Sequence, residues 1–214
     1  MASIKKLSVT TPDYWSDACE HLIKKDRVMK RLIPLYGDAR LETRGDAFFT
    51  LARSIVGQQI SVKAAATIWE RFTKLSSIIT PTNVLKLNLN DMRLAGLSSR
   101  KVEYLVDLAL SFANGRVAPV VWDDMPDEDI IMELTAIRGI GRWTAEMFLM
   151  FHLMRPNILP LDDVGLIKGI SHSYFSGDVV SRSDAREVAL AWSPFCSVAT
   201  WYIWRSLDPT PVLY

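Results

Sequence analysis

Leu134-Thr-Ala-Ile-Arg-Gly-Ile-Gly-Arg-Trp-Thr-Ala-Glu-Met147 is the stretch that decides the fold of this chain. Apolar residues repeat at helical spacing from Ile130 onward, after an acidic first turn that complements a helix N-terminus. Gly139 ends that helix, because glycine reaches positive φ without a steric penalty. A second helix begins just after Gly141. The sequence therefore predicts a helix, a tight glycine hairpin and a second helix.

Two glycines that flank one aliphatic residue can serve a binding role as well as a turn. Gly139 and Gly141 leave several backbone N–H groups unhindered at a helix N-terminus, which is a good place to bind a phosphate. Arg142, with Arg138 and Lys168, would add positive charge, although solvated surface charge is the commoner role for any single basic residue. An ordinary helix corner with glycine as C-cap is the alternative for this short motif.

The segment Leu161-Asp-Asp-Val-Gly-Leu-Ile-Lys168 follows the hairpin and begins another predicted helix. An aspartate before a helix is commonly an N-cap, and capping does not exclude catalysis. Together the two segments resemble the helix-hairpin-helix superfamily of DNA glycosylases, in which an essential aspartate follows the hairpin by some twenty residues. Asp163 lies at that distance from Trp143. The resemblance implies that Asp163 is catalytic, with Asp162 as the reserve candidate.

Composition and net charge argue against several other classes of protein. The 214 residues are 49% hydrophobic, enough to bury a substantial core. The net charge of +1 argues against a protein that binds DNA by electrostatics alone. Cys19 and Cys196 are too few for a disulfide framework or a four-thiolate iron–sulfur cluster. The first residues lack the apolar core of a secretory signal, and no apolar run is long enough to span a membrane.

Periodicity predicts an all-α protein, since no useful strand alternation occurs anywhere in the chain. The resemblance implies two helical lobes with the active-site cleft between them. Residues 40–155 would form a helical barrel with the hairpin. Residues 1–39 and 156–214 would form the lobe that carries Asp163. Only about forty residues precede the predicted helix start at Asp46, so we expect no N-terminal β-domain of the kind some members carry.

Gly57-Gln-Gln-Ile-Ser61 interrupts a long helical pattern. On composition alone this is as easily a solvated turn as a binding loop. The run from Phe49 to Ala65, however, resembles the loop with which these glycosylases probe the duplex. Gln59 aligns with the side chain that enters the gap left by an extruded nucleotide, and Gln58 is its neighbour. An uncharged amide can bond the orphaned base with both donor and acceptor groups.

In the family that the chain resembles, the residue at position 143 distinguishes enzymes that also cut the DNA backbone from those that only remove the base. Family members that also cut the DNA backbone carry a nucleophilic lysine after Gly-x-Gly-Arg, whereas this chain has Trp143, which cannot form a Schiff base. Gly-Arg-Trp-Thr-Ala instead resembles the 3-methyladenine DNA glycosylase II branch. The resemblance makes Trp143 and Trp204 aromatic walls of the base pocket, where a large ring favours a cationic base. A lone helical tryptophan would otherwise be a core residue.

The chain departs from that branch at two positions of the site. Met147 stands where an aromatic residue is common, so we expect a softer or wider base pocket. The C-terminal motif reads Trp192-Ser-Pro-Phe-Cys-Ser197, with Cys196 in place of the usual arginine. The role of that arginine cannot be assigned from the sequence.

The sequence therefore predicts a monofunctional glycosylase that removes alkylated purines, of the 3-methyladenine and 7-methylguanine type, and leaves an abasic site. Two alternatives stay open: a non-catalytic hairpin module, and a bifunctional glycosylase/lyase. The preferred base among damaged purines is not fixed by the sequence.

The same resemblance sets the expected partners. We expect double-stranded DNA as the partner, a monomer, and a cytoplasmic (nucleoid) or, in a eukaryote, nuclear location. No cofactor and no catalytic metal are implied. A structural monovalent or calcium ion held by backbone carbonyls at the hairpin is typical of such motifs.

Overall fold

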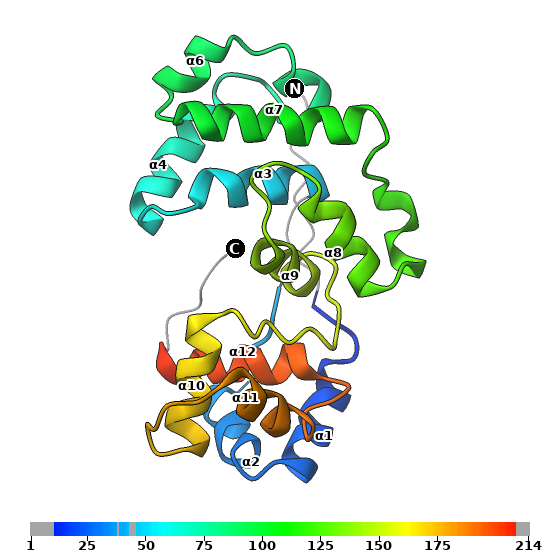
Figure 1. Cartoon of the computed structure of the whole chain (residues 1–214), viewed down its shortest axis with the longest axis vertical. Helices are drawn as coiled ribbons and strands as arrows, with labels where there is room; N and C mark the ends of the chain where they lie inside the picture. Colours follow the sequence, from blue (N-terminus) through cyan, green and yellow to red (C-terminus); the bar gives the residue numbers. More distant parts are fainter. Residues whose placement is uncertain (1–10, 38, 43–45, 209–214) are drawn as a thin grey trace. The chain divides into compact units, whose positions relative to one another are not determined.

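The computed structural model describes residues 11–37, 39–42 and 46–208. Every regular element in these ranges is helical, so the predicted all-α class is confirmed. Two compact units divide the chain: unit 1 comprises Met1–Arg44 with Leu149–Tyr214, and unit 2 comprises Gly45–Phe148. The expected lobe boundaries at residues 40 and 155 lie a few residues outside unit 2. Most of the helices of both units are labelled in Figure 1.

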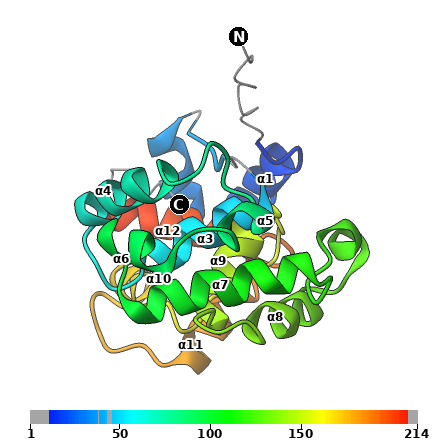
Figure 2. The same cartoon turned by 90° about the horizontal axis from the view of Figure 1, so that it is seen from above.

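Unit 2 contains the hairpin and the candidate probing loop. Its elements are α3 (Ala47–Gly57), α4 (Val62–Thr73), α5 (Pro81–Val84), α6 (Leu89–Leu94), α7 (Ser99–Ala113), η2 (Pro119–Asp124), α8 (Asp127–Thr135) and most of α9 (Arg142–Phe151). Helix α7 is the centre of the unit, since α3, α5 and α6 all pack against it (Figure 2).

A row of edge-on aromatic rings fills the core of unit 2. Phe48 of α3 meets Phe112 of α7 at 5.4 Å between ring centroids, Phe112 meets Trp122 at 6.4 Å, and Trp122 meets Phe148 of α9 at 5.4 Å. Edge-to-face contacts of this kind add to the free energy gained by burying the rings. The row ties α3 and α7 to α9, the helix that follows the hairpin.

Side-chain caps set the helix ends on either side of the probing loop. The Asp46 carboxylate accepts a hydrogen bond from the Phe49 N–H at 2.8 Å, which confirms the predicted start of α3. Ser61 caps α4 and Ser98 caps α7 in the same way. The four residues from Gln58 to Ser61 are therefore a defined connection between two capped helices.

Unit 1 holds the candidate catalytic aspartate. Its elements are α1 (Trp15–Lys25), α2 (Met29–Leu32), η1 (Ile33–Tyr36), α10 (Val164–Tyr174), α11 (Arg182–Ala189) and α12 (Cys196–Leu207). The core lies around α12, which packs against α1, α2 and α10. Trp15 and Trp201 meet edge to face at 5.2 Å in this core.

A buried carboxylate fixes the N-terminal helices of unit 1. One Asp26 oxygen accepts hydrogen bonds from the N–H groups of Val28 and Met29, which begin α2. The other oxygen accepts from the Tyr174 hydroxyl at 2.8 Å and the Trp192 indole N–H at 3.2 Å. Asp26 therefore joins α2 to segments from the second half of the chain.

The end of α8 differs from the predicted one. Helix α8 ends at Thr135 and a short turn leads to Gly139, whereas we expected Gly139 itself to end the helix. The cause is local: the chain closes this turn with a bond from the Ile140 N–H to the Ile137 carbonyl.

Candidate nucleic-acid interface and active site

The hairpin between α8 and α9 uses its two glycines differently. Gly139 has φ +87°, and a Cβ on it would lie 2.3 Å from the Tyr104 ring. Both its conformation and the neighbouring ring therefore require glycine there. Gly141 has an ordinary φ, and a Cβ on it would meet no described atom within 4 Å. The protein's own packing does not require glycine at 141, so the residue is free to serve the approach of a ligand to the backbone.

Arg142, the first residue of α9, makes its contacts within the protein. Its Nε donates to Glu146 at 2.9 Å, and its two terminal nitrogens donate to both oxygens of Glu128. The hydrogen bond to Glu128 raises the pKa of Arg142 above its ordinary value. A phosphate contact from this guanidinium would have to replace bonds that already exist. The predicted phosphate-binding role of Arg142 stays a prediction, and the backbone of the hairpin is the better-placed group.

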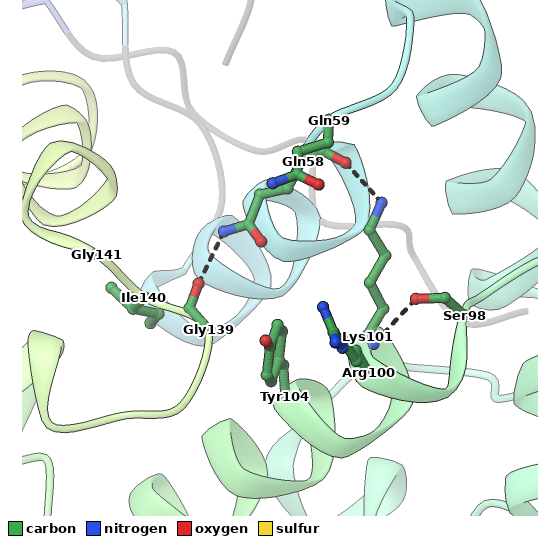
Figure 3. A pocket seen from close by; sticks show the side chains of 9 residues that line it. All are labelled: Gln58, Gln59, Ser98, Arg100, Lys101, Tyr104, Gly139, Ile140 and Gly141. Carbon is green, nitrogen blue, oxygen red and sulfur yellow. Dashed lines mark hydrogen bonds between the residues drawn. The ribbon is translucent and has the colours of Figure 1, made fainter.

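The two glutamines of the probing loop also differ. The half-buried Gln58 side chain donates through Nε2 to the Gly139 carbonyl at 2.9 Å and so joins the loop to the hairpin (Figure 3). Gln59 is exposed and has φ +58°, a left-handed conformation that is uncommon outside glycine. Of the two predicted probing residues, Gln59 is therefore the exposed one and Gln58 is bonded to the hairpin, and the probing role of both stays a prediction.

A cavity of about 400 Å³ opens between the loop, the hairpin and the N-terminus of α7 (Figure 3). Its lining is mostly polar and includes Arg100, Lys101 and Tyr104 of α7. All of these elements belong to unit 2. The loop and the hairpin are recognisable in the sequence, but the contribution of α7 is not, because its apolar periodicity indicates only a helix with one buried face.

Asp163 caps α10, as predicted, and has a second donor. Its Oδ1 accepts a hydrogen bond from the Leu166 N–H at 2.6 Å and another from the Trp204 indole N–H at 2.7 Å. Asp162, the reserve candidate, instead forms an ion pair with Arg182. The two neighbouring aspartates therefore have different surroundings, and only Asp163 has its carboxylate fixed by neutral N–H donors.

Trp204 of α12 joins the catalytic candidate to an aromatic stack. Its ring stacks on Phe151 with centroids 5.9 Å apart and planes 10° from parallel. Gly165 lies against the Asp163 carboxylate and the Trp204 ring, since a Cβ there would be 3.0 Å from Asp163 Oδ1 and 3.3 Å from the Trp204 ring. Sequence analysis missed Phe151 and Gly165 as neighbours of the site. The Asp-Asp-Val-Gly sequence contained the one available signal, a glycine two residues after the catalytic candidate.

The remaining pocket candidates lie on α9 and α12. Trp143 is half-buried and Met147 is 4% exposed, and both belong to unit 2, whereas Asp163 and Trp204 belong to unit 1. Their roles as walls of a base pocket stay predictions. Cys196, in place of the family's usual arginine, is buried, and burial raises the pKa of its thiol to about 11. The thiol is therefore protonated and unreactive at neutral pH.

Metal binding was expected only at the hairpin backbone. Among residues 11–37, 39–42 and 46–208, no group of three or more His, Cys, Asp or Glu side chains could hold a metal ion. The Ile137 and Gly139 carbonyls each accept one hydrogen bond, from Ile140 and Gln58 respectively. A carbonyl oxygen has two lone pairs, so both can still contribute to a weakly held ion. The ion itself stays a prediction.

In the part of the chain that the structure describes, no helix is both long enough and apolar enough to cross a membrane.

Residues 52–194 match the model of the HhH-GPD superfamily of base excision DNA repair proteins. A putative DNA-3-methyladenine glycosylase of Bacillus subtilis is 33% identical over 74% of this chain, and the chain spans 58% of that relative's length.

Two solved structures are similar over nearly the whole chain. A DNA-3-methyladenine glycosidase of Bacillus halodurans has a TM-score of 0.84 at 32% identity and covers 94% of this chain and 93% of its own. A 3-methyladenine DNA glycosylase of Schizosaccharomyces pombe, in complex with abasic DNA, has a TM-score of 0.76 at 29% identity and covers 92% and 100%. With its glycine hairpin and capping aspartate, the chain belongs to the HhH-GPD superfamily of base excision DNA repair proteins.

Proposed function

We propose that this protein is a monofunctional DNA glycosylase that extrudes alkylated purines from double-stranded DNA and hydrolyses their glycosidic bond, leaving an abasic site. The observation that carries the proposal is the Asp163 carboxylate, fixed at the start of α10 by the Leu166 N–H and the Trp204 indole N–H. The names of the similar proteins support the substrate class, and the S. pombe complex supports DNA as the partner.

The proposed reaction requires one carboxylate. As the bond between C1′ and the base breaks, the base leaves with the electron pair and positive charge develops on the sugar. Asp163 stabilises that charge and accepts a proton from the water that attacks C1′. An N3- or N7-alkylated purine is cationic before it leaves and becomes neutral as it leaves, so no general acid is needed. Trp143, and the face of Trp204, would stack on such an electron-poor base.

The hairpin and loop would hold the DNA in the extruded state. Backbone N–H groups around Gly141 would bind phosphate without regard to sequence. Gln59 would enter the gap in the duplex. We expect a monomer that acts wherever the cell's DNA lies, with no catalytic metal.

The test compares Asp163→Asn with Asp162→Asn on methylated duplex DNA. Asp163→Asn should lower single-turnover base release by about 100-fold or more, because it removes one preorganised charge from the transition state. Its affinity for DNA with an abasic-site analogue should change little. Asp162→Asn should keep most of the activity, because it loses only a surface ion pair with Arg182. The reverse result would move the catalytic role to Asp162.

A further inference from the structure

Helix α7 contacts both DNA-facing segments of unit 2 with one face. Lys101, Tyr104 and Asp107 lie one turn apart on that face and reach the probing loop, the hairpin glycine and the residue before that glycine (Figure 3 draws the first two). The loop and the hairpin are far apart in sequence. Their common contacts with α7 therefore determine the position of the loop relative to the hairpin.

Lys101 makes the contact with the loop. Its Nζ donates to the Val56 carbonyl at 2.7 Å and to the Gln58 carbonyl at 2.8 Å. These carbonyls belong to the C-terminal end of α3, where partial negative charge favours a cation. Lys101 is half-buried, and burial lowers the pKa of its ammonium group below the ordinary value. The ammonium is therefore committed to the protein more than a surface lysine is.

The residue that follows these carbonyls is under strain. Gln59 has φ +58°, and a non-glycine residue keeps such a conformation only where its surroundings impose it. Lys101 fixes the Gln58 carbonyl, the last backbone group before Gln59. The Gln58 side chain bonds to Gly139, which in turn rests on the Tyr104 ring. Three contacts therefore constrain the backbone that presents Gln59.

Arg100 provides an internal comparison. It is the residue before Lys101, it is exposed, and it lines the same cavity. Within the described residues the Arg100 side chain makes no hydrogen bond. Both side chains carry one positive charge at nearly the same place, but only Lys101 is bonded to the loop.

We propose that Lys101 is a positioning residue, which holds Gln59 in the conformation that enters the duplex. The proposal rests on the proposed glycosylase function and assigns Lys101 a role in base extrusion. Phosphate binding by Lys101 is the competing role, because Lys101 also borders the cavity. The two roles differ in what they change: positioning affects extrusion, and phosphate binding affects affinity for any duplex.

The experiment compares Lys101→Met, Lys101→Arg and Arg100→Met by three measurements. These are affinity for undamaged duplex, base release from methylated duplex in single turnover, and fluorescence of 2-aminopurine placed opposite an abasic-site analogue. The fluorescence reports whether the orphaned base is unstacked, and it does not depend on catalysis. Thermal unfolding of each variant shows that it is folded, and Lys101→Gln, which keeps a donor, replaces Lys101→Met if that variant is not folded.

Lys101→Met should lower base release and the rate of the fluorescence change by about tenfold, the scale of losing the charged hydrogen bond to the Gln58 carbonyl. Its affinity for undamaged duplex should stay within about threefold, since it loses no phosphate contact. Lys101→Arg should restore most of the loss, because it can still donate to both carbonyls. Adding Gln59→Ala to Lys101→Met should make extrusion no slower than Gln59→Ala alone, as two changes that act through one group are not additive.

Equal losses of affinity for undamaged duplex in Lys101→Met and Arg100→Met, with extrusion unchanged, would overturn the proposal in favour of phosphate binding. Additive effects of Lys101→Met and Gln59→Ala would also overturn it. Failure of the proposed function is a separate outcome: wild-type protein would then release no base from methylated DNA, whereas the fluorescence comparison would still test the positioning of Gln59.

Discussion

At the scale of single residues, Trp204 has a contact that its predicted role as a pocket wall did not include. Its indole N–H bonds to Asp163 at 2.7 Å while its ring stacks on Phe151. One side chain thus orients the carboxylate and also presents an aromatic surface. These two functions can be separated by a substitution that keeps a ring but removes the N–H.

Trp204→Phe keeps an aromatic ring but removes the hydrogen bond to Asp163. It should slow single-turnover base release by roughly 10- to 100-fold, because a hydrogen bond to a charged group contributes about 1.5 to 3 kcal/mol. Binding of an abasic-site analogue should change much less. Phe151→Leu, which keeps the indole N–H, is the control and should slow the reaction less. An equal loss in both variants would assign Trp204 a packing role only.

Substitutions at the two hairpin glycines should separate an effect on stability from an effect on DNA binding. Gly139→Ala should lower the free energy of unfolding by about 1 to 3 kcal/mol, because it strains a positive φ and drives a Cβ into the Tyr104 ring. Gly141→Ala should leave stability nearly unchanged, since space around it is open, but should weaken binding to damaged and undamaged duplex alike. Denaturant unfolding and fluorescence anisotropy measure the two quantities. Weaker binding confined to one lesion would place Gly141 in the base pocket instead.

At the scale of elements, the approach of α10 to α12 places Asp163 next to Trp204. Gly165 and Gly169 lie one turn apart on α10, and both face α12. A Cβ on Gly169 would lie 2.2 Å from Cγ2 of Ile203. Small residues at this contact let the two helices come close enough for a side-chain hydrogen bond between them.

Gly169→Ala should therefore lower the free energy of unfolding by about 1 to 3 kcal/mol through overpacking. It should also slow base release, because it moves α10 away from Trp204. Adding Ile203→Ala removes the obstructing methyl and should restore part of the activity, even though the double variant loses buried surface. Full activity in Gly169→Ala at unchanged stability would mean that the contact relaxes without moving Asp163.

The contribution of Asp107, at the contact between α7 and the hairpin, to the free energy of unfolding should depend on pH with a definite sign. Burial would raise the pKa of Asp107, but hydrogen bonds from the Arg138 N–H at 2.8 Å and the Arg116 guanidinium at 2.9 Å outweigh it and leave the pKa below its ordinary value. A depressed folded-state pKa contributes stability above the unfolded value of about 3.9, and that stability is lost as the pH falls through the folded value.

Asp107→Asn should thus be less stable than wild type by about 1 to 2 kcal/mol between pH 5 and 8, and the difference should shrink below about pH 4. Urea unfolding at a series of pH values measures it. Glu103→Gln is the control, since its ion pair with Arg138 is exposed and should contribute less than about 1 kcal/mol. A difference that persisted undiminished in acid would show that the Asp107 charge is not its source.

At the scale of the whole molecule, much of the architecture follows from local sequence. The helical class, the caps at Asp46 and Asp163, and the helix over Cys196–Leu207 are all readable, because capping and periodicity act within a few residues. The glycine hairpin is readable for the same reason.

The contacts between the site residues cannot be predicted from capping and periodicity. Trp204 reaches Asp163 across 41 residues, Gln58 reaches Gly139 across 81, and Lys101 reaches Gln58 across 43. Periodicity predicts which face of a helix is buried but not which polar side chain of another helix it meets. The ion pair of Arg142 with Glu146 is an i,i+4 pair that the sequence can indicate, but its pairing with Glu128 of α8 depends on how the hairpin brings the two helices together.

The central claim is that the protein hydrolyses the base–sugar bond and stops there. Trp143 stands where lyase members carry a lysine, and indole has no amine to form an imine with C1′. The most direct measurement incubates wild-type protein with methylated duplex DNA, in parallel with and without borohydride, and follows released base and strand breaks. We predict released base, strand breaks only after alkali, and no trapped protein–DNA adduct. A borohydride-trapped adduct, or strand breaks before alkali, would contradict the account.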